Sequence, residues 1–162
     1  MSFLFTSESK PVITEMKEKD KKIEYKRIIY PTEPLNIEDG YYDITKKNKC
    51  LIGYFKNNEM VNGIEHYFDE NNENEHEYFE GEFENKSLKK GIYNYFSLKH
   101  LTIDEGTFID IDNRILLHGK NEKRTFHNGI VYEGEFIKDL PTTGIYKIPP
   151  KTYVNINNIK SL

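Results

Sequence analysis

Two pairs of glutamates are the first residues in this sequence that suggest a chemical role. One glycine separates Glu80 from Glu82, and another separates Glu133 from Glu135. Paired carboxylates can bind a divalent ion or a basic partner, or hydrolyse a glycosidic bond when they lie about 5–10 Å apart across a cleft. Side chains alternate across a β-strand, so each pair is expected on one strand face. Such a face supplies no cleft, and we expect solvated carboxylates that protect the sheet from edge-to-edge association.

The remaining reactive side chains lack the spacing of catalytic or metal sites. Cys50 has no motif around it and is expected to be a packed thiol. The glycines are not followed by a helix and Lys-Ser/Thr, so no phosphate-binding loop is predicted. Lys86, Lys89, Lys90 and Lys99 form only a small basic area. The histidines show no zinc-ligand spacing and are expected in turns or on the surface. The sequence therefore predicts no catalytic residue, no metal ligand and no cofactor. The histidines are His66, His76, His100, His118 and His127.

The composition narrows the class of protein. The chain has 162 residues, a net charge of −4 and an estimated pI of 5.8, which argues against nucleic-acid binding and against electrostatic docking on anionic lipid. A single cysteine excludes an intramolecular disulfide. The apolar start at residues 1–5 is too short for a signal peptide. We expect an intracellular protein, either cytoplasmic or cytoskeleton-associated.

A short pattern repeats four times and predicts the architecture. A glycine is followed two residues later by a phenylalanine, at steps of 28, 25 and 28 residues. A second glycine follows the first by 10 residues in three units and by 13 in the third. Self-similarity at a period of this size indicates a repeat array. The defining positions are Gly53, Phe55, Gly63; Phe79, Gly81, Phe83, Gly91, Tyr93; Gly106, Phe108, Gly119; and Tyr132, Gly134, Phe136, Gly144, Tyr146.

Each repeat unit reads as a β-hairpin with one aromatic face. Alternation places Tyr132, Gly134 and Phe136 on one side of a strand, and Glu133 and Glu135 on the other. The glycine leaves a groove that neighbouring rings can cover. A single hairpin is marginally stable in water, so successive hairpins are expected to stack and bury their aromatic faces in a continuous row.

The best units resemble the MORN repeat, which is built on Tyr-x-Gly-x-Trp/Phe followed by Gly-x-Gly-x-Tyr. The match is clearest in Tyr132–Phe136 with Gly144–Tyr146, and nearly as good in Phe79–Phe83 with Gly91–Tyr93. Divergent MORN-like variant repeats are an equally fair description. The resemblance covers residues 39–150 and implies an all-β fold, an elongated single-layer antiparallel sheet of repeated hairpins that is twisted and partly curled. Leu51 and Asp104 replace the leading aromatic residue in the first and third units.

The repeats also divide the chain. Residues 1–38 are expected to form a separate N-terminal segment, residues 39–156 the hairpin array and residues 157–162 a tail. The charged run from Glu15 to Arg27 is compatible with a short helix. Lys22–Tyr30 reads as a strand that ends at Pro31 and Pro34.

Proteins that resemble MORN arrays act as scaffolds, as cytoskeletal, ciliary or membrane-associated adaptors, or as appendages to a catalytic domain. We therefore expect a non-enzymatic scaffold or protein-protein interaction module, with a protein partner or self-association and no nucleic-acid partner. The alternatives are a peripheral phospholipid-binding adaptor, and a small carbohydrate-active or hydrolytic protein. Surplus tyrosines either form the array's own core or contact a partner. They are Tyr41, Tyr42, Tyr54, Tyr67, Tyr93 and Tyr95.

Overall fold

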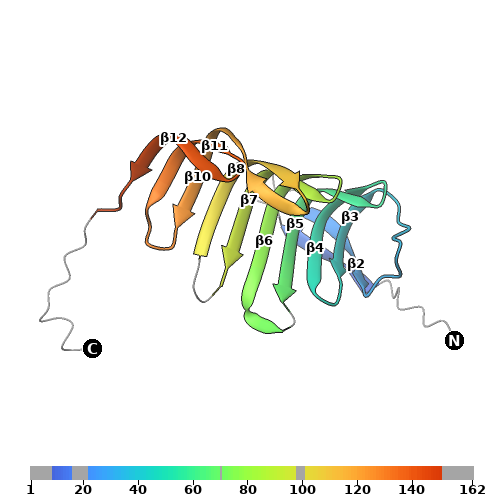
Figure 1. The fold of residues 1–162 in the computed structure, drawn as a ribbon. Coiled ribbons are helices and arrows are strands. Elements are labelled where there is room, and N and C mark those ends of the chain that lie inside the picture. The colour runs from blue at the N-terminus through green and yellow to red at the C-terminus, as the bar shows by residue number, and fades with distance from the viewer. Residues whose placement is uncertain (1–8, 16–21, 70, 98–100, 151–162) are drawn as a thin grey trace, which may run out of the picture.

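The computed structural model describes residues 9–15, 22–69, 71–97 and 101–150. Twelve strands and no helix occur in these residues, which confirms the expected all-β fold. Residues 16–21 of the charged run lie outside the described part, and Lys22 begins a strand. The strands (Figure 1) are β1 (Ser9–Glu15), β2 (Lys22–Ile29), β3 (Gly40–Thr45), β4 (Lys49–Lys56), β5 (Glu59–Asp69), β6 (Asn72–Glu84), β7 (Ser87–Phe96), β8 (Leu101–Ile111), β9 (Arg114–Leu117), β10 (Gly119–Phe126), β11 (Val131–Ile137) and β12 (Leu140–Lys147).

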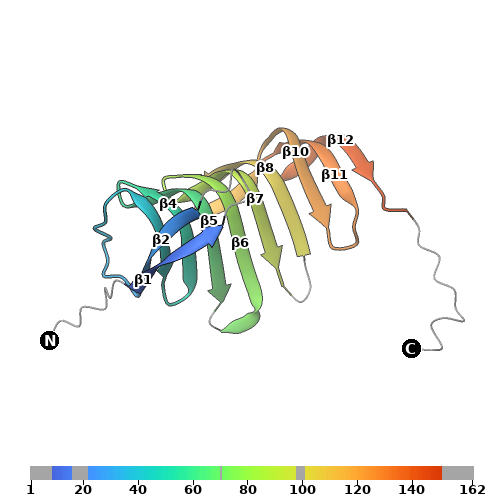
Figure 2. The same cartoon turned by 180° about the vertical axis from the view of Figure 1, so that it is seen from behind.

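The strands form one open sheet whose spatial order follows the sequence. The order is β1-β2-β3-β4-β5-β6-β7-β8-β10-β11-β12, and β9 pairs with the second half of β8. One pairing departs from the expected antiparallel pattern. Strands β2 and β3 are parallel, because residues 30–39 carry the chain back along the sheet before β3 begins. Figures 1 and 2 show an elongated, curved ribbon with β1 and β2 at one end and β12 at the other.

Four hairpins turn sharply through two residues, and we call these turns the hairpin tips. Both residues of each turn have a positive φ, between 44° and 73°. Positive φ at both central positions is the geometry of a type I′ turn, whose twist matches that of the strands it joins. The tips are Asn57-Asn58, Asn85-Lys86, Asp112-Asn113 and Lys138-Asp139.

The repeat glycines line up in a row across the sheet. Gly63 pairs with Gly81, Gly81 with Gly91, and Gly91 with Gly106. Within the β6–β7 hairpin the two strands lie too close for side chains, since a Cβ on Gly81 would lie 2.1 Å from the Lys90 carbonyl oxygen. The reciprocal Cβ on Gly91 would lie 2.0 Å from a carbonyl oxygen of the facing strand. Backbone contact therefore requires the glycines of this hairpin, and the same holds for the glycine pairs Gly53–Gly63 and Gly134–Gly144.

The core lies on one side of the sheet, which we call the inner face; the opposite side is the outer face. Phe55, Phe83, Phe108 and Phe136, each two residues after a repeat glycine, lie on the inner face and are at most 6% exposed. Residues from the returning strands, Met60, Leu88 and Leu117, complete the cluster with Leu51 and Phe79.

The hairpin tips fold over the inner face. Asp139 in the fourth tip hydrogen-bonds to Arg124 on β10, although Arg124 pairs with Tyr132 near the far end of β11. Tyr132 precedes Asp139 by seven residues. A straight strand would separate two such positions by about 20 Å. The ribbon therefore bends sharply between the tips and the rest of each strand, which we call the strand bodies, as Figures 1 and 2 show.

Candidate functional site

The paired glutamates occupy the outer face. Glu80 and Glu82 are exposed there. Glu80 accepts a hydrogen bond of 2.7 Å from the Tyr78 hydroxyl, and the Lys147 ammonium lies 2.8 Å from Glu133. Each bond joins the carboxylate to a side chain on its own strand or on the adjacent strand. The contacts are those of a solvated strand face.

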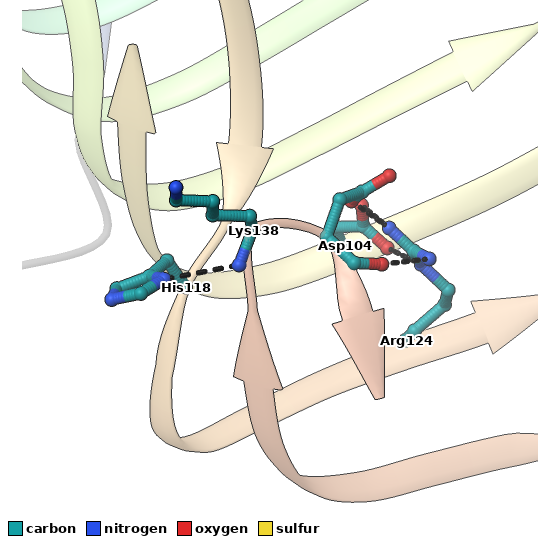
Figure 3. A network of polar contacts seen from close by, with 5 residues as sticks. Asp104, His118, Arg124 and Lys138 are labelled. Atoms are coloured by element: carbon teal, nitrogen blue, oxygen red, sulfur yellow. Dashed lines mark hydrogen bonds and ion pairs between the residues drawn. The ribbon is translucent and has the colours of Figure 1, made fainter. Parts of the chain in front are cut away.

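Two other carboxylates are buried, and the sequence reasoning did not single them out as a site. Asp104 is 4% exposed and Glu122 is 5% exposed. Asp104 occupies the leading aromatic position of the third repeat, where it pairs with Arg124 on β10. The Arg124 Nε and Nη2 atoms donate to the two Asp104 oxygens over 2.7 and 2.8 Å (Figure 3). The sequence signal for this ion pair is an acidic residue at a repeat position that is aromatic in the second and fourth units.

The same guanidinium also holds a hairpin tip. Arg124 Nη1 donates to the Asp139 carbonyl oxygen over 3.3 Å, and Nη2 forms an ion pair with the Asp139 carboxylate. The Phe136 ring lies 5.1 Å from the guanidinium carbon, in a cation–π contact. Burial lowers the pKa of Arg124, but hydrogen bonds and charges from Asp104 and Asp139 outweigh burial and raise it above its ordinary value. Burial raises the pKa of Asp104, against the opposing effect of Arg124.

Glu122 stands at the cross-strand position where the other hairpins have their second glycine. Its carboxylate accepts from the Thr107 amide over 2.6 Å and from the Thr107 hydroxyl over 2.8 Å. A Cβ on Gly106 would lie 1.4 Å from one Glu122 oxygen, and a Cβ on Gly119 would lie 2.0 Å from the other. The 13-residue glycine gap of the third unit was the sequence signal for this irregularity.

Next to the ion pair, the inner face carries a groove of about 340 Å³ between the strand bodies and the β8–β9 tip. The Tyr93 hydroxyl donates to Glu77 over 2.8 Å, and the Tyr93 ring stacks on Phe79 at 4.7 Å. Burial and the nearby Glu77 raise the pKa of Tyr93. Its hydroxyl is therefore a hydrogen-bond donor and not a base at neutral pH.

The structure does not gather the singled-out tyrosines on one surface. Tyr42 is 4% exposed and its hydroxyl donates to the Glu38 carbonyl, so it belongs to the core. Tyr41 and Tyr54 lie on the outer face, with ring centroids 5.1 Å apart. Tyr67 and Tyr95 share the inner face, because they occupy the same cross-strand row.

The outer face carries a cluster of two histidines and three aromatic rings: His66, Phe68, His76, Tyr78 and Phe96. The His66 and His76 ring centroids lie 5.4 Å apart, and Phe68 lies 4.3 Å from His66. Burial, together with the charge of a protonated His76, lowers the pKa of His66. Burial and Glu80 raise the pKa of Tyr78 to about 12. These two histidines lie within β5 and β6 and are half-buried. The described ranges contain no group of three potential metal ligands.

The far end of the sheet is uncovered in the described residues. All eight residues of β12 are exposed, including Leu140 at 68%, Ile145 at 66% and Tyr146 at 58%. One edge of β12 pairs with β11, and no described strand pairs with the other edge. Backbone amides and carbonyls along such an edge are available to another polypeptide.

Comparisons with protein families, curated proteins and solved structures found no match to this chain. In the described part of the chain there is no helix that could cross a lipid bilayer.

Proposed function

We propose that this chain is a non-enzymatic, MORN-like hairpin-repeat scaffold that binds another protein through the uncovered end of its sheet. The observation that supports this proposal most directly is the exposure of β12. It combines a free backbone edge with large apolar side chains. Edges of this kind accept an additional strand, with main-chain hydrogen bonds giving affinity and alternate side chains giving specificity.

The protected state of the other repeats supports the same proposal. Tyr93, the counterpart of Tyr146, is stacked on Phe79 and contacts Phe108 of the next unit. Tyr146 contacts only Tyr132 of its own hairpin among aromatic neighbours in the described residues. The fourth repeat, at the end of the row, therefore exposes the same kind of surface that each preceding repeat buries against its neighbour.

Affinity purification of the tagged full-length protein from its native cells tests this function. We expect a reproducible protein partner that the Ile145→Glu variant fails to retain, because a charge on the edge opposes strand addition. The control is Ile29→Glu on β2, which makes the same change at a residue that is 38% exposed near the opposite end of the sheet. Equal retention by wild type and Ile145→Glu, or no partner at all, would contradict the proposal.

A further inference from the structure

We infer that the partner supplies a strand with the pattern aromatic-Glu-Gly-x-Phe, antiparallel to β12, with its glycine opposite Gly144. This inference rests on the proposed function and specifies the chemistry of the partner. It follows from how the sheet already joins one hairpin to the next.

β12 is the last strand of its hairpin. Three strand pairs that connect one hairpin to the next, which we call joints, show what kind of strand pairs with such a last strand. They are β5–β6, β7–β8 and β10–β11. At each joint the incoming strand places a glycine at the same level: Gly81 opposite Gly63, Gly106 opposite Gly91, and Gly134 opposite Glu122.

The residue before that glycine is a glutamate at all three joints. Glu80 lies opposite Ile64, Glu105 opposite Ile92, and Glu133 opposite Lys123. The facing position on β12 is Ile145. We therefore expect the strand that pairs with β12 to carry a glutamate opposite Ile145, on the outer face.

The residue directly before this glutamate places its side chain on the inner face. Phe79 lies opposite Glu65, and Tyr132 lies opposite Arg124. The exception is Asp104, which lies opposite Tyr93 and whose charge is met by Arg124 on the next strand. The facing position on β12 is Tyr146, the counterpart of Tyr93. A carboxylate across from Tyr146 would need a cation of the Arg124 kind, whereas an aromatic residue pairs with the ring directly, so we infer an aromatic residue there.

A second copy of this chain cannot supply that strand. The strands that carry Glu-Gly-x-Phe are β6, β8 and β11, and each is already paired along both edges. The strands with an edge that pairs with no described strand are β1 and β9, which contain no glycine, and β12 itself, in which Thr143 and not a glutamate precedes Gly144. All ten glycines of the sequence lie in the described ranges, so the other residues of this chain do not carry the signature either. The occupant is therefore a different protein with this strand signature.

A labelled nine-residue peptide with the sequence of residues 76–84 serves as the probe, and fluorescence anisotropy against the full-length protein measures its affinity. We expect saturable binding that Ile145→Glu weakens about fivefold, because like charges directly opposite each other destabilise a strand pair. Ile145→Lys is expected to bind at least as tightly as wild type. A second peptide carrying Glu80→Lys is expected to reverse the order of the two variants.

Three results would overturn the inference. The first is no saturable binding of either peptide at millimolar protein. The second is binding that Ile145→Glu and Ile145→Lys affect equally, or that the control Ile29→Glu weakens as much. The third is a dimer by light scattering that Ile145→Glu dissociates, since a second copy would then occupy β12. Failure of the peptide with continued β12-dependent capture of a native partner would reject the signature alone; failure of both would reject the proposed function.

Discussion

At the scale of single residues, the third repeat differs most from the others. Asp104 stands where Phe79 and Tyr132 stand in neighbouring units, and it is buried with a bidentate arginine partner. A buried carboxylate needs hydrogen bonds or a cation in place of the water that it loses. Arg124 meets this need and also contacts Asp139, so one side chain links two strands and a hairpin tip.

Removing this arginine is expected to destabilise the fold strongly. Arg124→Met leaves Asp104 buried without a cation, which typically costs about 3–5 kcal/mol in the free energy of unfolding. The double variant Asp104→Phe/Arg124→Met is expected to recover most of that loss, because it restores the aromatic residue of the repeat. Urea unfolding followed by circular dichroism measures both.

The control for this experiment is the neighbouring pair of Lys123 and Glu105. These side chains are 43% and 39% exposed and lie 3.1 Å apart. Exposed ion pairs contribute about 0–1 kcal/mol, so Lys123→Met is expected to change stability little. Similar losses for Arg124→Met and Lys123→Met would show that the buried pair does not anchor the tip.

The lowered pKa of His66 predicts that the fold loses stability in mild acid. Its pKa in the fold is lowered from 6.5, so the unfolded chain binds a proton more readily than the native state does. Between the lowered value and 6.5 the free energy of unfolding therefore falls as pH falls. We expect His66→Phe to flatten this part of the stability profile, measured by urea unfolding from pH 7 to pH 5. His127→Asn, at an exposed turn, should keep the wild-type slope, and an unchanged slope in His66→Phe would be evidence against the assignment.

At the scale of elements, the hairpins could be predicted because their signal is local and periodic. Glycine and phenylalanine at fixed spacing indicated the strands, and the structure places those phenylalanines in the core. Other features depend on contacts between distant residues. Asp104 and Arg124 are 20 residues apart, and Glu122 reaches Thr107 across 15 residues. The folding of the tips over the inner face likewise follows from cross-strand packing, which a single repeat unit does not encode.

The tips themselves predict a stabilising substitution. Lys86 has a φ of 65°, a conformation that costs a residue with a Cβ roughly 1–2 kcal/mol. Lys86→Gly converts the tip to Asn-Gly, which suits a type I′ turn, and is expected to raise stability by about 1 kcal/mol. Lys86→Val should lower it, since a β-branched residue fits this geometry poorly. Thermal unfolding distinguishes the two, and a lower melting temperature for Lys86→Gly would rule out relief of backbone strain.

At the scale of the whole molecule, the protein is a row of hairpins with an inner face, an outer face and two ends. Packing between consecutive hairpins covers each internal joint, whereas β12 is left with one open edge in the described residues. The sequence predicted the array of hairpins, which the structure confirms, and protein binding remains a proposal. The sequence did not single out β12, because exposure of an edge depends on what lies beside it and not on its own residues.

The hairpin tips are short, and this has a practical consequence for protein engineering. In three of the four hairpins the second glycine follows the first by 10 positions, whereas Gly81 follows Gly63 by 18 positions and Gly106 follows Gly91 by 15. Length differences between units therefore concentrate at the rim opposite the tips. An affinity tag or fluorescent domain inserted between Asn128 and Gly129, an exposed turn between β10 and β11, would enter the chain at the rim opposite the tips. Insertion at this turn leaves the short hairpin tips and their contacts with the inner face intact.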